Sequence, residues 1–276
     1  MFSFIILHYK NISETLNCLY KLQAFKNNDC NFIVVDNNSL SLEEEKEIKE
    51  YTEDIVKLNK NYGFAKANNK GIKYAKNKYN SKFYIVINND VEITQENFLQ
   101  LIIDDYDKYQ FDMLGPWIDT PGNSVNPFNA YTTKEQIEYE INKCKKIINI
   151  CNSGIKYYLL MLGVKIKSIF KKNRKPVNEN KLKEGVALHG CAIIFSDKYV
   201  KKYDYPFYND TFLFHEEDFL YQRVLKDKLI TVYDPNLKVY HKEGSTMGVI
   251  NKNARMKRKF REEERLKSLE LLLKEM

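Results

Sequence analysis

The sequence predicts an α/β fold with a mostly parallel central sheet and flanking helices. Apolar, strand-like runs alternate with segments of helical apolar spacing through residues 2–117. The clearest run, from Phe83 to Ile87, is apolar or aromatic at every position, as expected of a strand that is buried on both faces. Alternation of this kind favours parallel strands joined by right-handed helical crossovers. In such sheets ligands bind beyond the carboxyl ends of the strands, so the polar residues there are the functional candidates.

Each expected element follows from its own pattern. Short runs rich in Ile, Val and Phe predict strands at 2–7, 31–35, 54–58, 83–87 and 113–117. Apolar residues at helical spacing predict helices at 12–25, 65–79 and 98–109, and charged residues predict a surface helix at 43–51. Strand character returns at 186–195, 229–233 and 238–240.

The organisation expected is one large domain with two additions. The domain covers residues 1–248 and contains a helical, basic insertion at about 121–184, and a charged C-terminal helix follows at 249–276. Within the insertion, the apolar stretch 157–164 precedes a lysine-rich segment at 165–175. This pattern is that of an amphipathic basic helix, which could lie on an anionic membrane surface. Packing of its apolar face on the core is the alternative.

Composition narrows the class of protein. The chain has 276 residues and a formal net charge of +7, which suits an anionic partner such as a nucleotide, a lipid headgroup or nucleic acid. Its five Cys residues are odd in number and lack paired metal spacing, which favours a reducing cytosol. The sequence shows neither a signal peptide nor an apolar run long enough to span a bilayer. We therefore expect a cytoplasmic protein, soluble or peripheral on the inner face of the membrane.

Polar residues follow several of the predicted strands. Asp36 closes the second strand, where its carboxylate either accepts hydrogen bonds from a base or ribose or stabilises an Asx-turn. Asp90 follows the central strand, and its oxygens suit Mg²⁺ or Mn²⁺, with a turn and helix cap as the alternative. Gly63, with Asn68 after it, either lets the backbone approach a ligand or simply begins a helix.

A second acidic group lies late in the chain, where His215 precedes Glu216, Glu217 and Asp218. Like charges so close together raise the pKa of a carboxyl group, which suits a general base. The N-terminus of a helix also favours acidic residues, so the cluster alone leaves both interpretations open.

Six short motifs occur in order along the chain. They are IVVDNNS at 33–39, NYGFAKANNKG at 61–71, INNDV at 87–91, GCA at 190–192, EE at 216–217 with Arg223, and HKEGS at 241–245. Together they resemble glycosyltransferase family 2, in particular bacterial rhamnosyltransferase-like and capsular polysaccharide members. The resemblance covers about residues 2–120 and 185–248, and it implies the GT-A fold, in which a Rossmann-like sheet binds a nucleotide-diphosphate sugar.

The resemblance assigns residues to a donor, expected to be a UDP- or dTDP-sugar. Asp36 would accept hydrogen bonds from the base, and Asn68 would line the nucleotide pocket. The remaining donor-binding positions that we expect are His8, Asn38, Gly63, Asn88, Asn89, Asp90, His189 and Gly190.

The same resemblance implies a divalent cation, Mg²⁺ or Mn²⁺. Asp90 would be the metal-binding member of a DxD-like motif, and His241 would approach the same cation and the diphosphate. Asn88 replaces the first acid of that motif, so one carboxylate and the diphosphate would hold the cation. Its role would be to neutralise charge on the leaving diphosphate.

The expected general base is Glu217. Family members commonly have Glu-Asp at this position, and counting back from Arg223 places the second acid at Glu217. Glu217 would deprotonate a hydroxyl of a polysaccharide or lipid-linked oligosaccharide in an inverting transfer, as in capsule, O-antigen or other surface glycan synthesis. Glu216 and Asp218 would orient it or substitute for it. Trp117 is a candidate for stacking on a sugar ring, with core packing as the alternative.

Two other functions compete with transfer. A nucleotidyltransferase has a similar sheet but requires a Gly-rich, basic loop after the first strand, where this chain has His8-Tyr9-Lys10-Asn11. A protein that binds nucleotide sugars or glycans without transfer activity would keep the pocket and lack the base. Nucleic acid is not an expected partner, because aromatic and basic residues do not interleave around a groove.

Overall fold

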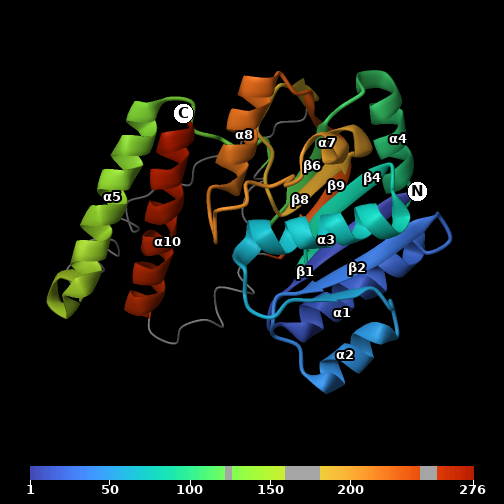
Figure 1. Ribbon diagram of the computed structural model, residues 1–276, viewed down its shortest axis with the longest axis horizontal. Helices are drawn as coiled ribbons and strands as arrows, with labels where there is room; N and C mark the ends of the chain where they lie inside the picture. The colour runs from blue at the N-terminus through green and yellow to red at the C-terminus, as the bar shows by residue number, and fades with distance from the viewer. Residues whose placement is uncertain (122–125, 159–180, 243–253) are drawn as a thin grey trace.

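A nine-stranded sheet forms the centre of the computed structural model, which describes residues 1–121, 126–158, 181–242 and 254–276 (Figure 1). The strand order is β3-β2-β1-β4-β8-β6-β9-β5, and β7 pairs with β9. The four strands of one half are parallel: β1 (Phe2–His8), β2 (Cys30–Asp36), β3 (Ile55–Lys57) and β4 (Phe83–Asn88).

The other half of the sheet is mixed. Its strands are β5 (Val91–Glu92), β6 (Met113–Asp119), β7 (Lys183–Glu184), β8 (Ala192–Ser196) and β9 (Thr231–His241). β8 is antiparallel to both β4 and β6, and β6 is parallel to β9. β6 and β9 therefore run in the direction of β4, and the carboxyl ends of β1, β2, β4, β6 and β9 share one edge of the sheet. The predicted α/β class and mostly parallel sheet are confirmed.

Helices cover both faces of the sheet. On one face, α1 (Ile12–Leu22), the short η1 (Gln23–Phe25), α2 (Leu42–Lys49) and α4 (Phe98–Tyr109) pack on the alternate strand residues. On the other face lie α3 (Gly63–Tyr79), α7 (Asp197–Lys202) and α8 (Glu216–Asp227). Strand β4 is buried on both sides, because alternate residues such as Ile85 and Val86 enter the two different cores.

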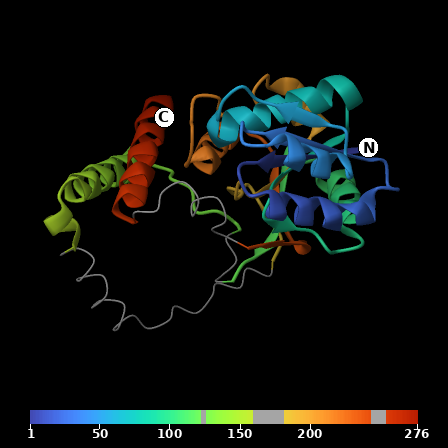
Figure 2. The same cartoon turned by 90° about the horizontal axis from the view of Figure 1, so that it is seen from below.

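Two long helices form a separate pair beside α8. Figures 1 and 2 show α5 (Lys134–Asn152) and α10 (Ala254–Glu275) side by side, with α8 between them and the sheet. Leu269 and Leu272 of α10 share a small core with Ile137 of α5 and Phe219 of α8. The predicted C-terminal helix is thus present, whereas the domain boundary at residue 248 stays a prediction.

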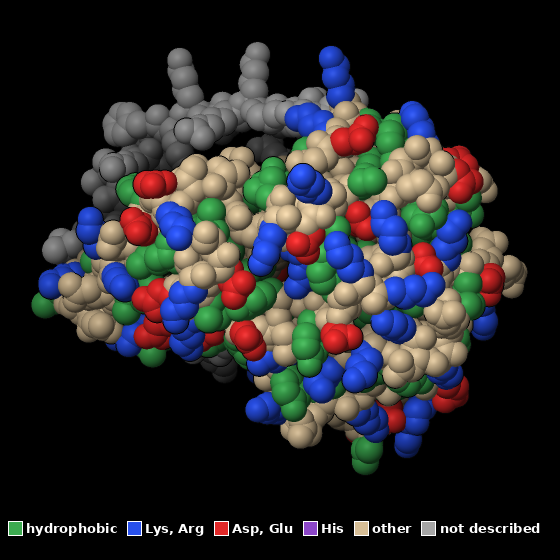
Figure 3. All heavy atoms as spheres, turned by 45° about the horizontal axis from the view of Figure 1, so that its top comes forward, with side chains coloured by type: hydrophobic (Ala, Val, Ile, Leu, Met, Phe, Trp, Pro, Cys, Tyr) green, Lys and Arg blue, Asp and Glu red, His purple; other side chains and the backbone are tan. Residues whose placement is uncertain are grey.

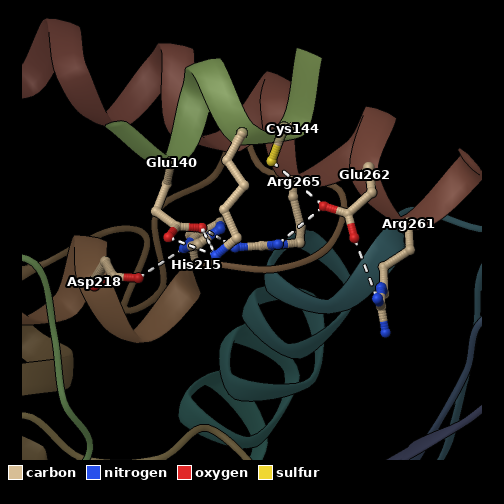
Figure 4. A network of polar contacts seen from close by, with 8 residues as sticks. Glu140, Cys144, His215, Asp218, Arg261, Glu262 and Arg265 are labelled. Atoms are coloured by element: carbon tan, nitrogen blue, oxygen red, sulfur yellow. Dashed lines mark hydrogen bonds and ion pairs between the residues drawn. The ribbon is translucent and has the colours of Figure 1, made fainter. Parts of the chain in front are cut away.

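Polar contacts fix this helix pair (Figure 4). The Arg265 guanidinium of α10 lies 3.1 Å from Glu140 of α5 and 2.9 Å from Glu262. The Cys144 thiol of α5 lies 3.5 Å from the Glu262 carboxylate, which is almost fully buried. Because the buried Glu262 has a charged partner, its burial is compensated.

Several element boundaries differ from the sequence-based expectation. The strands expected at 229–233 and 238–240 are parts of the single strand β9, whose register shifts so that Asp234 faces Pro116 and Lys238 faces Trp117. The strand expected at 186–195 begins only at Ala192, because the Gly190 N–H bonds to a side chain of α8 rather than to a neighbouring strand.

The basic segment at 165–175 lies outside the described residues. Across the described part of the chain, no helix is both long and apolar enough to cross a membrane. On the face shown in Figure 3, Lys and Arg side chains are interspersed with acidic ones rather than gathered into one patch.

Candidate active site at the strand ends

A cavity of about 280 Å³ lies at the carboxyl ends of β1, β2 and β4. Aromatic rings and side-chain amides make up most of its wall. The rings are those of Tyr9, Phe64, Phe212, Phe214 and Phe260, and the amides are those of Asn37, Asn61, Asn88 and Asn89. None of the described residues that line it carries a charge. Such a wall suits a flat, neutral heteroaromatic ring that stacks on aromatic side chains and hydrogen-bonds to amides.

Asn37 joins the two loops that form one side of this cavity. Its Nδ2 donates to Asn61 Oδ1 at 2.9 Å and to the Gly63 carbonyl at 3.0 Å, and its Oδ1 accepts from the Tyr62 N–H at 2.8 Å. The loop after β2 is therefore fixed to the loop before α3. Asn37 is the second residue of the Asp-Asn-Asn motif, and it was not among the predicted site residues.

Gly63 permits a close approach between two backbones. Its φ is +78°, and a Cβ added there would lie 2.0 Å from the Phe212 carbonyl oxygen. That carbonyl accepts from the Phe64 N–H at 2.8 Å. In this structure the absence of a side chain at Gly63 lets the backbone of Phe212 pack against it. The expected contact of Gly63 with a donor stays a prediction.

Asn68 and Asn69 face different surroundings on α3. Asn68 is fully buried, its Nδ2 donates to the Phe64 carbonyl at 3.1 Å, and its Oδ1 has no hydrogen-bond partner among the described residues. Asn69 instead exchanges two hydrogen bonds with the Phe207 backbone, both at 2.9 Å. Asn69 therefore fixes the chain around Phe207 to α3, whereas the Oδ1 of Asn68 accepts no hydrogen bond from the described residues.

The residues around Asp36 are ordered by local hydrogen bonds. Asp36 Oδ1 accepts from the N–H groups of Ser39 and Leu40 at 2.8 and 3.2 Å, so the Asx-turn interpretation is correct for that oxygen. Asn38 is exposed, with φ +63°. His8 pairs with Asp36 across β1 and β2 but is fully buried, and burial lowers the pKa of its imidazole. The expected contacts of these residues with a donor stay predictions.

Buried hydrogen bonds hold the loop that follows β4 in place. Asn89 Nδ2 donates to Thr15 Oγ1 of α1 at 2.9 Å, and His8 Nδ1 lies 2.7 Å from the same hydroxyl. On the other side of the loop, the Asn88 N–H donates to the Cys191 carbonyl at 3.0 Å. These contacts fix the backbone on which Asp90 follows.

The structure brings together the two predicted metal ligands. His241 Nε2 at the end of β9 lies 3.1 Å from Asp90 Oδ1, and both side chains are mostly buried. The Lys242 N–H donates to the Asp90 carbonyl at 3.2 Å and continues the β5–β9 pairing.

These two side chains fit a divalent cation. A carboxylate oxygen is the donor that Mg²⁺ and Mn²⁺ prefer, and an imidazole nitrogen can complete the set for Mn²⁺. Among the described residues, His241 Nδ1 has no hydrogen-bond partner, and no cluster contains three or more His, Cys, Asp or Glu side chains. Two protein ligands are thus what this part of the chain offers, and a diphosphate would complete the coordination.

Glu217 is held beside the start of β8. Its Oε1 accepts from the Gly190 N–H at 3.0 Å, and a Cβ on Gly190 would approach that oxygen to 3.0 Å. His189 directly precedes Gly190, and the centre of its ring is 6.4 Å from that of the His241 ring. Gly190 thus contacts the predicted base, and its neighbour His189 lies near His241. The partly exposed Glu217 carboxylate can accept a proton from a bound hydroxyl.

The acids beside Glu217 have other surroundings. Asp218 is buried and accepts hydrogen bonds from His215 Nδ1 and the Tyr131 N–H, both at 2.8 Å. Glu216 is buried as well. Burial, and secondarily the charge of Glu217, raise the pKa of Glu216 to about 8. The expected roles of Glu216 and Asp218 as orienting or substitute acids stay predictions.

One wall of the cavity comes from a part of the chain without a recognisable motif. Phe260 of α10 lines the cavity together with Leu213, whose carbonyl accepts from Ser268 Oγ of α10 at 3.0 Å. No pattern in the charged C-terminal helix distinguishes Phe260 from a residue that packs on a neighbouring helix, so sequence reasoning missed it.

Two known proteins that this chain resembles are a hexosyltransferase in sequence and TarS in structure. The chain is 30% identical over 103 residues to the "Low-salt glycan biosynthesis hexosyltransferase Agl10" of Haloferax volcanii, a match that covers 36% of this chain and 31% of that protein. It resembles the crystal structure of S. aureus TarS 1–349 in complex with UDP-GlcNAc, with a TM-score of 0.52 at 18% identity, over 91% of this chain and 61% of that one.

The longer TarS structure gives a TM-score of 0.53 at 18% identity, over 87% of this chain and 36% of that one. This chain thus spans less than two thirds of the length of these relatives. The likeness confirms the expected GT-A fold. The family model for Glycosyl transferase family 2 matches residues 3–172, so the chain belongs to that family.

Proposed function

We propose that this protein is an inverting glycosyltransferase that moves a sugar from a nucleotide diphosphate to a hydroxyl of a glycan or lipid-linked oligosaccharide. The observation that carries the proposal is the position of Glu217. Its carboxylate accepts from the Gly190 N–H, and the ring of the preceding residue, His189, lies 6.4 Å from the ring of His241, which contacts Asp90.

The cavity would bind the nucleoside of the donor. Its aromatic rings suit stacking on a planar base such as uracil or thymine. The TarS complexes with UDP-GlcNAc and UDP support a uridine nucleotide for a related fold. UDP- and dTDP-sugars are therefore the donors proposed for this chain.

In the proposed reaction Glu217 removes the proton from the acceptor hydroxyl. The acceptor oxygen then forms a bond to the anomeric carbon, and the bond from that carbon to the diphosphate oxygen breaks, releasing the nucleoside diphosphate. Asp90 and His241 would hold Mg²⁺ or Mn²⁺, which neutralises the charge that develops on the diphosphate. Inversion at the anomeric carbon comes from the family resemblance.

A role in capsule, O-antigen or other surface glycan synthesis fits the name of the Haloferax relative, which is a glycan biosynthesis hexosyltransferase. Placement at the cytoplasmic membrane face would use the basic segment at 165–175, which the structure does not describe. Binding to anionic liposomes at low salt tests that placement, and protein that remains in the supernatant contradicts it.

A screen of UDP- and dTDP-sugars tests the proposed function. Release of nucleoside diphosphate is measured with EDTA and with added Mn²⁺ or Mg²⁺. We expect one donor to be turned over, with loss of turnover in EDTA and recovery with the cation. Release of pyrophosphate from a nucleoside triphosphate and a sugar phosphate would instead identify a nucleotidyltransferase. Binding without turnover, with acceptor glycans present, would leave a binding protein.

A further inference from the structure

The end of β9 is bound to β5 and α1 through Lys242, the residue that follows His241. The Lys242 N–H donates to the Asp90 carbonyl at 3.2 Å, which continues the antiparallel pairing of β5 with β9 by one residue. Its ammonium group lies 2.9 Å from Glu14 of α1 and 3.1 Å from Glu92 of β5. Lys242 thus binds Asp90 through its backbone and two other acids through its side chain.

Helix α1 also holds the chain on both sides of Asp90. Asn17 of α1 donates from Nδ2 to Glu92 Oε1 at 2.7 Å, so the acid of β5 is bound both by this helix and by the residue after β9. Thr15 of α1 accepts from the Asn89 amide at 2.9 Å, directly before Asp90. The position of Asp90 therefore depends on how α1, β5 and the end of β9 are held together.

The ion pairs of Lys242 are partly shielded from water. The side chains of Glu14 and Glu92 are 20% and 19% exposed, and that of Lys242 is 36% exposed. An isolated, fully exposed ion pair contributes little to stability, but here one ammonium group joins two carboxylates from different elements. Without that ammonium group the two carboxylates would repel each other. The charge of Lys242 therefore favours the contact between α1 and β5 at the end of β9.

This arrangement bears on the two proposed metal ligands. His241 Nε2 lies 3.1 Å from Asp90 Oδ1, and the first belongs to β9 whereas the second precedes β5. Lys242 is next to His241 in the chain and is hydrogen-bonded to the Asp90 backbone. Because its side chain pairs with Glu14 and Glu92, Lys242 acts on the two ligands through the position of the backbone.

We infer that Lys242 is a positioning residue for the cation site: it holds the end of β9 against β5 and α1, and so sets the geometry in which Asp90 and His241 can share one cation. This inference rests on the proposed function, because it concerns the metal that these two side chains would hold. Residues that orient metal ligands commonly change metal affinity by about 10- to 100-fold when they are replaced.

Binding of Mn²⁺ to the full chain in the presence of UDP tests the inference, with free Mn²⁺ measured by electron paramagnetic resonance. Lys242→Met removes the charge and keeps an apolar stem, whereas Lys242→Arg keeps a cation that can bind two carboxylates. Lys238→Met, at an exposed position of β9, is the matched control. We expect the Kd for Mn²⁺ to rise about tenfold in Lys242→Met, to stay within about threefold in Lys242→Arg and to be unchanged in Lys238→Met.

A second variant tests the same ion pairs from the side of α1. Glu14→Gln removes one partner of Lys242 at a position distant in sequence from both metal ligands, and should raise the Kd for Mn²⁺ about threefold. Combined with Lys242→Met it should add little, because both changes break the same ion pair. Glu14→Gln alone decides the question if Lys242→Met does not fold.

UDP affinity in EDTA separates positioning of the metal ligands from direct contact with the nucleotide. Positioning predicts that Lys242→Met binds UDP without the metal as tightly as the unchanged protein does. A lysine that contacted the diphosphate itself would lose UDP affinity in EDTA as well.

Three results would overturn the inference. They are an unchanged Kd for Mn²⁺ in Lys242→Met, effects of Glu14→Gln and Lys242→Met that simply multiply, and a loss of UDP affinity in EDTA. In each case the proposed function stands as long as the unchanged protein binds UDP and Mn²⁺ and turns over donor. If the unchanged protein binds neither ligand and turns over no donor, the proposed function fails and this inference fails with it.

Discussion

Glu216 and Glu217 are consecutive residues with opposite surroundings at the start of α8. Glu217 is partly exposed and accepts from the Gly190 N–H, whereas Glu216 is buried and its Oε1 has no hydrogen-bond partner among the described residues. Burial, and secondarily the charge of Glu217, raise the pKa of Glu216 to about 8 and so disfavour its ionised form. Because Glu217 is partly exposed and Glu216 is buried, the geometry favours Glu217 as the general base.

The substitution Glu216→Gln tests whether burial raises the pKa of this carboxyl group. A carboxyl group whose pKa rises on folding contributes stability that is fully present below its ordinary pKa, near 4.5, and is lost as the pH rises through about 8. The loss is at most about 1.4 kcal/mol per pH unit in that window. Gln resembles the protonated acid and does not ionise. We therefore expect the variant to match the unchanged protein in thermal unfolding at pH 4.5 and to be more stable at pH 9.

The exposed substitution Glu53→Gln is the control for that series. It should leave the pH dependence of stability unchanged. A Glu216→Gln variant that loses stability between pH 5 and 9 as steeply as the unchanged protein would show that Glu216 does not titrate in this way.

Alanine substitutions at Gly63 and Gly185 distinguish the free-energy cost of backbone strain from that of a steric collision. Both have positive φ, +78° and +67°, but a Cβ on Gly63 would collide with the Phe212 carbonyl, whereas a Cβ on Gly185 would meet nothing within 4 Å. We expect Gly185→Ala to cost about 1 kcal/mol of unfolding free energy, from backbone strain alone. Gly63→Ala should cost about 3 kcal/mol or more, because the loop must also move. Urea unfolding measures both, and equal losses would contradict the close approach.

At the scale of elements, α10 extends the candidate site beyond the family motifs. Phe260 lines the cavity at the ends of β1, β2 and β4, and ion pairs to α5 fix the helix that carries it. We expect Phe260→Ala to weaken UDP binding about fivefold to tenfold, because one aromatic wall of the proposed nucleoside site is lost. Calorimetry with UDP measures the change. Met256→Ala, at a 43% exposed position of α10, is the control. Equal UDP affinity in both variants would show that α10 does not contribute to the pocket.

Helices and strands whose apolar residues recur at a regular spacing, or form a continuous run, were predicted well. The helix expected at 98–109 has those bounds, and the central strand expected at 83–87 extends by only one residue, to Asn88. The expectation of two late strands was wrong, because a register shift after Asp234 lets one strand continue past Pro235. A shift of this kind depends on the partner strand β6, which the local sequence of β9 does not encode.

Across the whole molecule, the fold brings distant predicted residues together. Asp90, in the turn between β4 and β5, contacts His241 although half of the chain lies between them, because the following strand β5 pairs with β9. The Asn37–Asn61 contact and the Phe260 wall were not predicted. The Asn37–Asn61 contact depends on how two loops face each other, and the position of Phe260 depends on the packing of α10 against α5. No regular spacing or motif in the sequence indicates either arrangement.

The most direct test of the account is the effect of Glu217→Gln on transfer and on donor binding. Gln keeps an oxygen for the Gly190 N–H and removes the proton acceptor. We expect the rate of sugar transfer to fall by about 10² to 10⁴-fold while UDP affinity stays within about twofold, with Glu53→Gln unchanged in both. Transfer that persists at the original rate in Glu217→Gln would contradict the role of Glu217 as the general base.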